Sequence, residues 1–149
     1  MAKSASEQLA HFIAKFDPKI ARLIRSCRVV LRKRFSTAFE IVYDNYNFFV
    51  IGYCSTERPS DCIVSLAANA KGLGLSFYRG AGLPDPEGRM LGSGSQNRFI
   101  RLPTAATLAE PAVAALLDAA TIQAKVAMPA SGRRTLIIKS VSAKQRPRK

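Results

Sequence analysis

The sequence predicts an α+β fold, with one antiparallel sheet of about four or five strands and amphipathic helices on one face. Apolar residues recur at helical spacing in the first 34 residues and again over 111–126. Between these stretches they form short runs rich in aromatic and β-branched residues, which is typical of strands. A length of 149 residues suits one domain. We therefore expect a single domain over 1–142 and a basic, disordered tail over 143–149.

The first helix has recognisable signals at both ends. Ser4 and Glu7 have the spacing of a capping box, in which each side chain accepts a hydrogen bond from the other's backbone N–H. The helix should end at Asp17–Pro18, because the residue before a proline avoids the α conformation. Between these signals an apolar stripe is formed by Leu9, Phe12, Ile13 and Phe16.

A second helix should start at the same dipeptide, because Pro18 fits the first helical position and Asp17 is a good N-cap. Its apolar stripe consists of Ile20, Leu23, Ile24, Cys27 and Leu31. The opposite face is basic and carries Arg22, Arg25, Arg32 and Lys33. Thr37 and Glu40 repeat the capping-box spacing, which predicts a short third helix over 37–44.

The remaining elements are strands and one helix. Strands are predicted over 47–55, 62–68, 73–78, 98–102 and 135–138, the first three joined by short polar turns. The segment 79–97 is a long glycine-rich loop, and loops of this length are usually functional or mobile. A helix is predicted over 111–126, with Pro111 near its first turn.

The most unusual property is the net charge of +13, from 23 basic and 10 acidic residues. Such a field attracts polyanions. No secretory leader or membrane-length apolar run is visible, so we expect a cytoplasmic protein without a membrane partner, whose thiols stay reduced. The single histidine, His11, and three cysteines suggest no metal site, cofactor or catalytic triad. The residues favour a non-enzymatic protein but leave activity undecided.

The main candidate site would bind a small anionic ligand. It combines the polar and aromatic residues before the first strand with the glycine loop before 98–102, and its members are Tyr43, Asp44, Tyr46, Gly92, Gly94 and Arg98. A structural interpretation is also open. The tyrosines would then only pack with their hydroxyls in water, and the glycines would form a flexible turn.

A nucleic-acid-associated accessory protein is the second hypothesis. The phosphate-binding surface would combine the basic helix face with the tail, using Arg22, Arg25, Arg32, Lys33, Lys144, Arg146 and Arg148. The alternative is that these residues form solvated surfaces that keep the protein soluble. Charge alone supports only non-specific contact with nucleic acid.

Several segments in order resemble the YdhG-like domain family of unknown function. They include 43–46 (YDNY), 80–86 (GAGLPDP), 91–94 (LGSG) and 137–148 (IIKSVSAKQRPR), and the similarity runs from about Phe16 to the tail. The resemblance implies a small α+β domain with a helix-covered sheet and no assigned activity. One branch of the family is described as a frataxin-like iron chaperone, which is a third functional alternative. Iron delivery would require clustered carboxylates on an exposed face.

Overall fold

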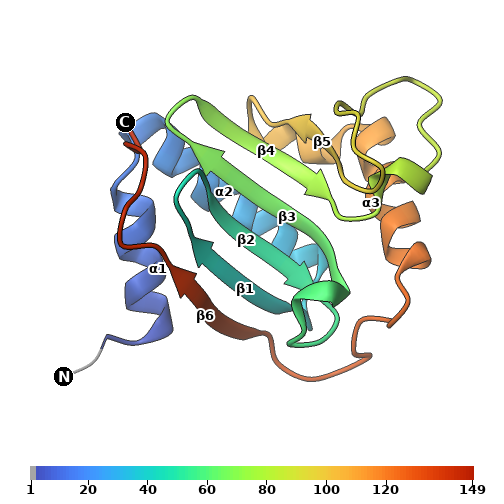
Figure 1. Ribbon diagram of the computed structural model, residues 1–149. Helices are drawn as coiled ribbons and strands as arrows, with labels where there is room; N and C mark the ends of the chain where they lie inside the picture. Colours follow the sequence, from blue (N-terminus) through green and yellow to red (C-terminus); the bar gives the residue numbers. More distant parts are fainter. Residues whose placement is uncertain (1–2) are drawn as a thin grey trace.

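A computed structural model describes residues 3–149 and contains three α-helices and one six-stranded sheet (Figure 1). The helices are α1 (Ala5–Ala14), α2 (Pro18–Arg34) and α3 (Pro111–Gln123). The strands are β1 (Phe39–Asp44), β2 (Phe49–Cys54), β3 (Cys62–Asn69), β4 (Gly72–Phe77), β5 (Arg98–Arg101) and β6 (Thr135–Val141). The α+β class is confirmed. None of the helices within residues 3–149 is both long and apolar enough to cross a membrane.

The N-terminal helices form for the reasons that the sequence indicates. Both reciprocal bonds of the capping box between Ser4 and Glu7 are present at the start of α1. Pro18 occupies the first turn of α2, where a missing backbone N–H costs nothing. Asp17 is the N-cap residue of α2, but its side chain makes no capping hydrogen bond.

The sheet has the order β5-β4-β3-β2-β1-β6 and is mixed, so the expected antiparallel sheet of four or five strands is wrong in detail. Strands β1 to β5 form an antiparallel meander. Strand β6 pairs with β1 in parallel, and Phe39 lies opposite Thr135. The chain reaches this position through the long connection from β5 that contains α3, because β5 and β6 lie at opposite edges of the sheet.

The helix expected over 37–44 is instead strand β1. Alternation explains the error, since Glu40, Val42 and Asp44 point toward the helices while the residues between them point away. Glu40 resembled the last member of a capping box, but it is a buried carboxylate that is held by Arg28 of α2.

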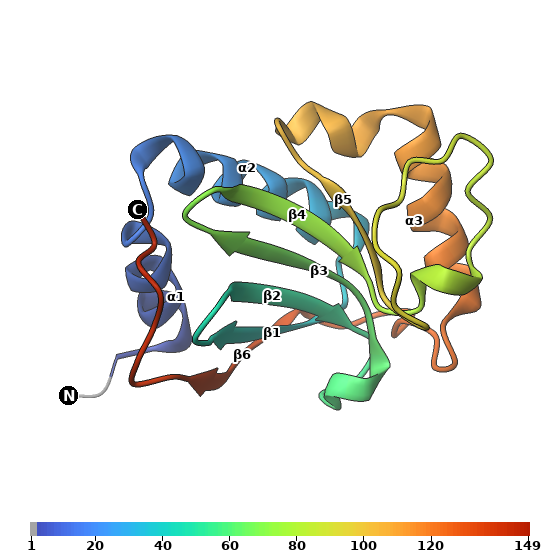
Figure 2. The same ribbon diagram turned by 45° about the horizontal axis from the view of Figure 1, so that its top comes forward.

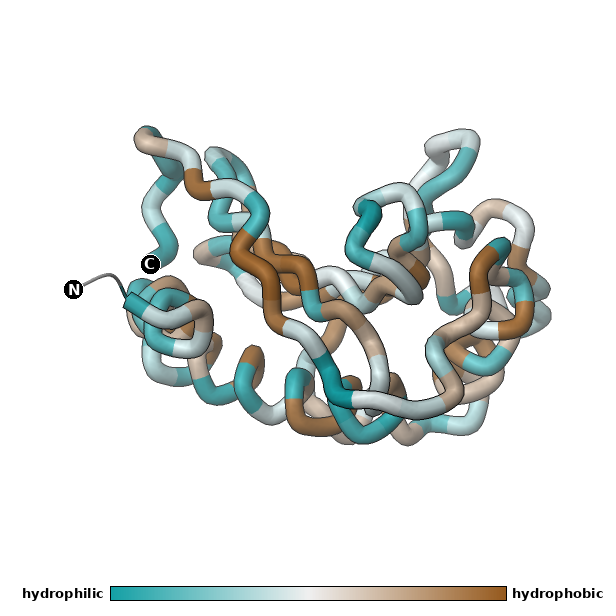
Figure 3. Tube along the Cα trace, turned by 90° about the horizontal axis from the view of Figure 1, so that it is seen from below, coloured by the Kyte–Doolittle hydropathy of each residue, from teal (hydrophilic) through white to brown (hydrophobic). Residues whose placement is uncertain are grey.

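One face of the sheet is covered and the other is open. In Figure 1, α2 lies behind the strands and α1 lies beside the sheet near β6, and Figure 2 shows α2 running across that same face. The core between the two layers contains Ile24 and Leu31 of α2 and Ile51, Leu66 and Leu75 of the sheet. The open face ends in two raised edges in Figure 3, formed by β6 with the chain after it and by the loop before β5.

The tail over 143–149 lies against the domain, where we expected disorder. Arg148 is 4% exposed, and its side chain bonds to Asp44 and to the backbone of Asn45. The backbone N–H of Arg146 donates to the Tyr46 carbonyl. A composition rich in basic residues suggested a solvated tail, but the buried partner that orders it lies about a hundred residues earlier in the chain.

Candidate functional site

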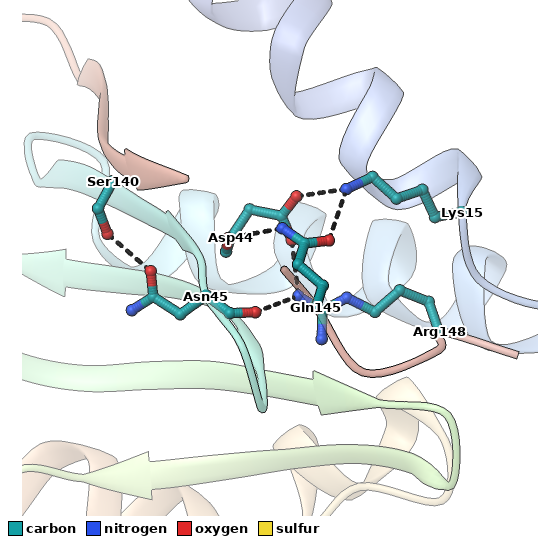
Figure 4. A network of polar contacts seen from close by, with 6 residues as sticks. All are labelled: Lys15, Asp44, Asn45, Ser140, Gln145 and Arg148. Atoms are coloured by element: carbon teal, nitrogen blue, oxygen red, sulfur yellow. Dashed lines mark hydrogen bonds and ion pairs between the residues drawn. The ribbon is translucent and has the colours of Figure 1, made fainter. Parts of the chain in front are cut away.

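The first half of the predicted site lies where β1 ends and turns into β2. Asp44 is fully buried and accepts hydrogen bonds from Lys15 Nζ at 2.6 Å and from Arg148 Nη2 at 2.9 Å (Figure 4). Gln145 joins the same network, because its amide donates to the Asp44 carbonyl and its oxygen accepts from Lys15. Asn45 is fixed by Ser140, whose hydroxyl donates to the Asn45 side chain at 2.7 Å.

This network holds the carboxylate in its charged form. Burial alone would raise the pKa of Asp44, but hydrogen bonds from Lys15, Gln145 and Arg148 outweigh it and hold the pKa below its usual range. Two further nitrogens of Arg148, Nε and Nη1, are buried without a hydrogen-bond partner among the described residues. The guanidinium lies 5.9 Å from the centre of the Phe16 ring, which partly compensates for that loss. Asp44 therefore anchors the tail and presents no free carboxylate to a ligand.

The two tyrosines of the predicted site differ in exposure and surroundings. Tyr46 is 49% exposed, and its ring lies 5.6 Å from the Arg146 guanidinium. Tyr43 is half-buried on the open face of the sheet, and burial raises its pKa. Neither hydroxyl meets the Asp44 carboxylate in a hydrogen bond among the described residues.

The second half of the predicted site is the loop that precedes β5. It brings Gly92, Gly94 and Arg98 together, as the sequence suggested. Arg98 donates from Nη1 to the Gly94 carbonyl and, at 3.0 Å, to the Asn97 carbonyl. Carbonyl oxygens therefore surround the guanidinium, and this arrangement closes a turn instead of forming an anion cradle of N–H groups. Gly92 has φ +107°, a conformation that favours glycine.

The two halves do not meet. Arg98 on β5 is aligned through Phe77, Val64 and Tyr53 with Glu40 of β1, whereas Asp44 lies four residues further along β1. Four strand spacings and four residue steps separate Arg98 from Asp44 by roughly 20 Å. The residues that we combined into one small-ligand site thus lie four strands apart and at opposite ends of the sheet.

A large hollow lies elsewhere: it begins over the open face and continues past the β3–β4 turn and the segment after β5 to α2 on the covered face. It has a volume of about 1420 Å³ and is lined by strands β2 to β5, the first turns of α2 and the segment after β5. Two rows of side chains cross this face. One row contains Tyr43, Val50, Ala67, Gly74 and Arg101, and the other contains Ile41, Gly52, Ser65, Ser76 and Phe99. The middle of each row is made of small residues, so the sheet backbone itself forms the floor.

The charged residues around this hollow are mostly basic. Lys19, Arg22, Lys71 and Arg101 line it, and Asp17 is the one acid among its lining residues. The rings of Phe48 and Phe99 also line it, and the Arg101 guanidinium lies 5.9 Å from the centre of the Phe99 ring. A single surface thus combines exposed backbone, aromatic rings and cations.

The basic residues that we assigned to nucleic acid fall into two groups. Arg32 lies 3.4 Å from Glu40, and Arg148 is bound to Asp44, so both belong to internal ion pairs. The others are Arg22, Arg25, Lys33, Lys144 and Arg146, and none has a carboxylate within 4.0 Å in the described part of the chain. Of these five, only Arg22 lines the hollow. The expected surface of helix plus tail therefore shares only Arg22 with the basic lining of the hollow.

Sequence reasoning missed Lys19, Lys71, Phe99 and Arg101 as members of this surface. The alternation of residues 98–101 placed Phe99 and Arg101 on one face of a strand, and this was the only signal in the sequence. Phe99 and Arg101 line the same hollow as Lys19 and Arg22 of α2 only because of the strand order, which a single sequence does not provide. Among residues 3–149, no three histidine, cysteine, aspartate or glutamate side chains gather where they could hold a metal ion.

Comparison with family models, with curated proteins and with solved structures gives no match to this chain. A functional proposal for this protein therefore depends on the hollow and on the charges around it.

Proposed function

We propose that this chain is a non-enzymatic binding domain that holds single-stranded nucleic acid, with limited sequence preference, in the open-face hollow. The observation that carries the proposal is the lining itself, which combines four basic side chains and two aromatic rings with a stretch of glycine, alanine and serine on the open face, while Lys19 and Arg22 line its continuation on α2. Proteins that bind single strands combine a positive groove for the phosphates with aromatic rings on which bases stack.

The size of the hollow favours a polymer. Pockets for small ligands usually enclose about 300 to 1000 Å³ and bury most of the ligand. A volume of about 1420 Å³, which extends from the sheet face round to α2, exceeds that range. An extended strand can occupy such a surface without being enclosed, and the small floor residues allow bases to approach the sheet closely.

The charge distribution supports the same ligand. The protein carries +13 overall, and the hollow has four cations against the single acid Asp17. Each phosphate neutralised on a single strand contributes roughly 0.7 to the salt dependence of log affinity. Four contacts therefore predict a slope of about −3, or an affinity loss of about 50-fold between about 50 and 200 mM salt.

The test is a fluorescence-anisotropy titration with labelled single-stranded DNA and RNA at several salt concentrations. Arg22 and Arg25 provide a matched pair, because both are exposed on α2 but only Arg22 lines the hollow. Arg22→Ala should reduce the magnitude of the salt slope by about 0.7, and Arg25→Ala should leave it unchanged. Phe99→Leu should weaken binding by about tenfold, because it removes a stacking ring and keeps an apolar side chain.

Equal effects of the two arginine variants would refute binding at this hollow. Absence of binding by the folded wild-type protein at low salt would refute nucleic-acid binding altogether.

A small anionic ligand is a second candidate at the same surface, and the juxtaposition of Arg101 with the Phe99 ring favours it, since such a pair can hold both charge and an aromatic group. A nucleoside monophosphate titrated alone separates the two candidates. Binding of the mononucleotide as tight as that of the oligonucleotide would support the small ligand.

A further inference from the structure

Two of the three cysteines lie opposite each other in the sheet. Cys54, the last residue of β2, pairs with Cys62, the first residue of β3, where the register shifts at a bulge. Directly opposed residues of antiparallel strands have Cα atoms about 4.5 to 5.5 Å apart, which lies within the range that a disulfide bond spans. Two cysteines that are separate in the sequence thus become a cross-strand pair.

The two sulfur atoms also converge in space. A Cβ atom built on Gly52 would lie 3.3 Å from Cys62 Sγ and 3.7 Å from Cys54 Sγ, so both sulfurs border the same point above this glycine. Side chains that point apart could not both approach it. The pair therefore satisfies the directional requirement for a disulfide as well as the distance requirement.

The two thiols differ in reactivity. The neighbouring Cys54 thiol lowers the pKa of Cys62, and burial opposes this only partly. The Ser65 hydroxyl lies 3.4 Å from the Cys62 sulfur and also favours its charged form. The neighbouring Cys62 sulfur and burial raise the pKa of Cys54. The lower pKa therefore favours Cys62 over Cys54 as the attacking thiol of the pair.

Solvent exposure also favours Cys62 over Cys54 as the attacking thiol. Cys54 is buried, whereas Cys62 is only half-buried and lines a small cavity of about 20 Å³ together with Ser55 and Asp61. Cys27 provides an internal reference, because it is fully buried on the inner face of α2 and burial raises its pKa to about 11.

We propose that Cys54 and Cys62 form a reactive dithiol that exchanges with low-molecular-weight disulfides. The Cys62 thiolate attacks one sulfur of the small disulfide, so that a mixed disulfide forms and the other half leaves as a thiolate. Cys54 then loses its proton to that thiolate or to water and attacks the Cys62 sulfur, which expels the second half as a thiolate that takes up a proton from water. Relative to the dithiol, the protein loses two protons and two electrons, and the small disulfide is reduced to two thiols.

The experiment incubates the reduced, full-length protein with oxidised glutathione, then denatures and alkylates it for intact-mass and peptide analysis. The wild type should keep one alkylatable thiol, at Cys27, and contain a Cys54–Cys62 disulfide. Cys54→Ser should stop at a stable glutathione adduct on Cys62, because the resolving thiol is absent. Cys62→Ser should form an adduct at Cys54 about tenfold more slowly or not at all.

Cys27→Ser is the matched control and should be oxidised at the wild-type rate. Circular dichroism establishes that each variant is folded, and Cys54→Ala gives a second variant that should trap the same adduct. Alkylation of all three cysteines in the wild type, which would show that none had been oxidised, would overturn the proposal. So would a disulfide that involves Cys27, or equal adduct formation by the Cys54→Ser and Cys62→Ser variants.

Discussion

Replacing Asp44 by asparagine should strongly destabilise the protein. Asparagine keeps the shape of the side chain but removes its charge, which leaves the Arg148 guanidinium, 3% exposed, without an anion. Removing one partner of a buried ion pair typically costs about 3 to 5 kcal/mol. Lys15, whose side chain is 34% exposed, can turn to solvent and limits the loss. We therefore expect the free energy of unfolding to fall by about 3 kcal/mol.

Urea denaturation followed by circular dichroism measures this loss. With a dependence of about 2 kcal/mol per molar urea, the midpoint should fall by about 1.5 M without a change in slope. Asp118→Asn is the matched control, because it breaks the ion pair with Arg34 at a site where Asp118 is 69% exposed. The control should lose less than about 1 kcal/mol.

A double-mutant cycle with Arg148→Met isolates the contribution of the pair. Because the double variant leaves no uncompensated charge at Arg148, it should be more stable than the sum of the single losses predicts, by about 2 kcal/mol. Additive losses, or an Asp44→Asn loss no larger than that of Asp118→Asn, would refute the conclusion that this buried carboxylate holds the tail through its ion pairs.

Three further predictions concern pH, the other buried carboxylate and a crowded glycine. Folding lowers the pKa of Asp44. The charged carboxylate therefore stabilises the protein fully above its unfolded-state pKa, and this stabilisation is lost as the pH falls through its folded-state pKa. Urea midpoints should therefore show the wild type and its asparagine variant converging below about pH 4. Tyr53→Phe should cost about 2 kcal/mol in the same assay, because it removes a hydroxyl that donates to buried Glu40 at 3.0 Å; a loss under about 0.5 kcal/mol would contradict this. Gly80→Ala should cost about 1 to 3 kcal/mol, because its Cβ would lie 2.6 Å from that of Arg98; Gly94→Ala, with nothing nearer than 3.7 Å, is the control and should unfold like the wild type.

Local signals in the sequence were sufficient for much of the fold. The capping box at Ser4 and the proline at position 18 placed two helices, and aromatic and β-branched runs placed β2 to β5 within one or two residues. They failed where a tertiary contact decides the conformation. Glu40 follows Thr37 at capping-box spacing, but it lies in a strand because its carboxylate pairs with Arg28 and Arg32 of α2.

The candidate site was less predictable than the fold. The polar residues around Asp44 and the loop at Arg98 were each identified, but joining them required a strand order that the sequence did not contain. The partner of Asp44 is the tail, about a hundred residues away, and no local pattern marks that contact. The Arg101 and Phe99 surface was likewise visible as one strand face, without any indication of what it opposes.

The parallel pairing of β6 with β1 has a consequence for synthesis on the ribosome. Strands β1 to β5 can pair as they emerge, because each is antiparallel to its neighbour in the chain. The outer edge of β1 must wait until Thr135–Val141 has been translated. Until then a growing chain exposes unpaired backbone groups along Phe39–Asp44. The Asp44 carboxylate also lacks its partner Arg148, which has not yet been translated. The nascent chain is therefore most open to strand exchange with another copy, or to chaperone capture, during the last part of its own translation.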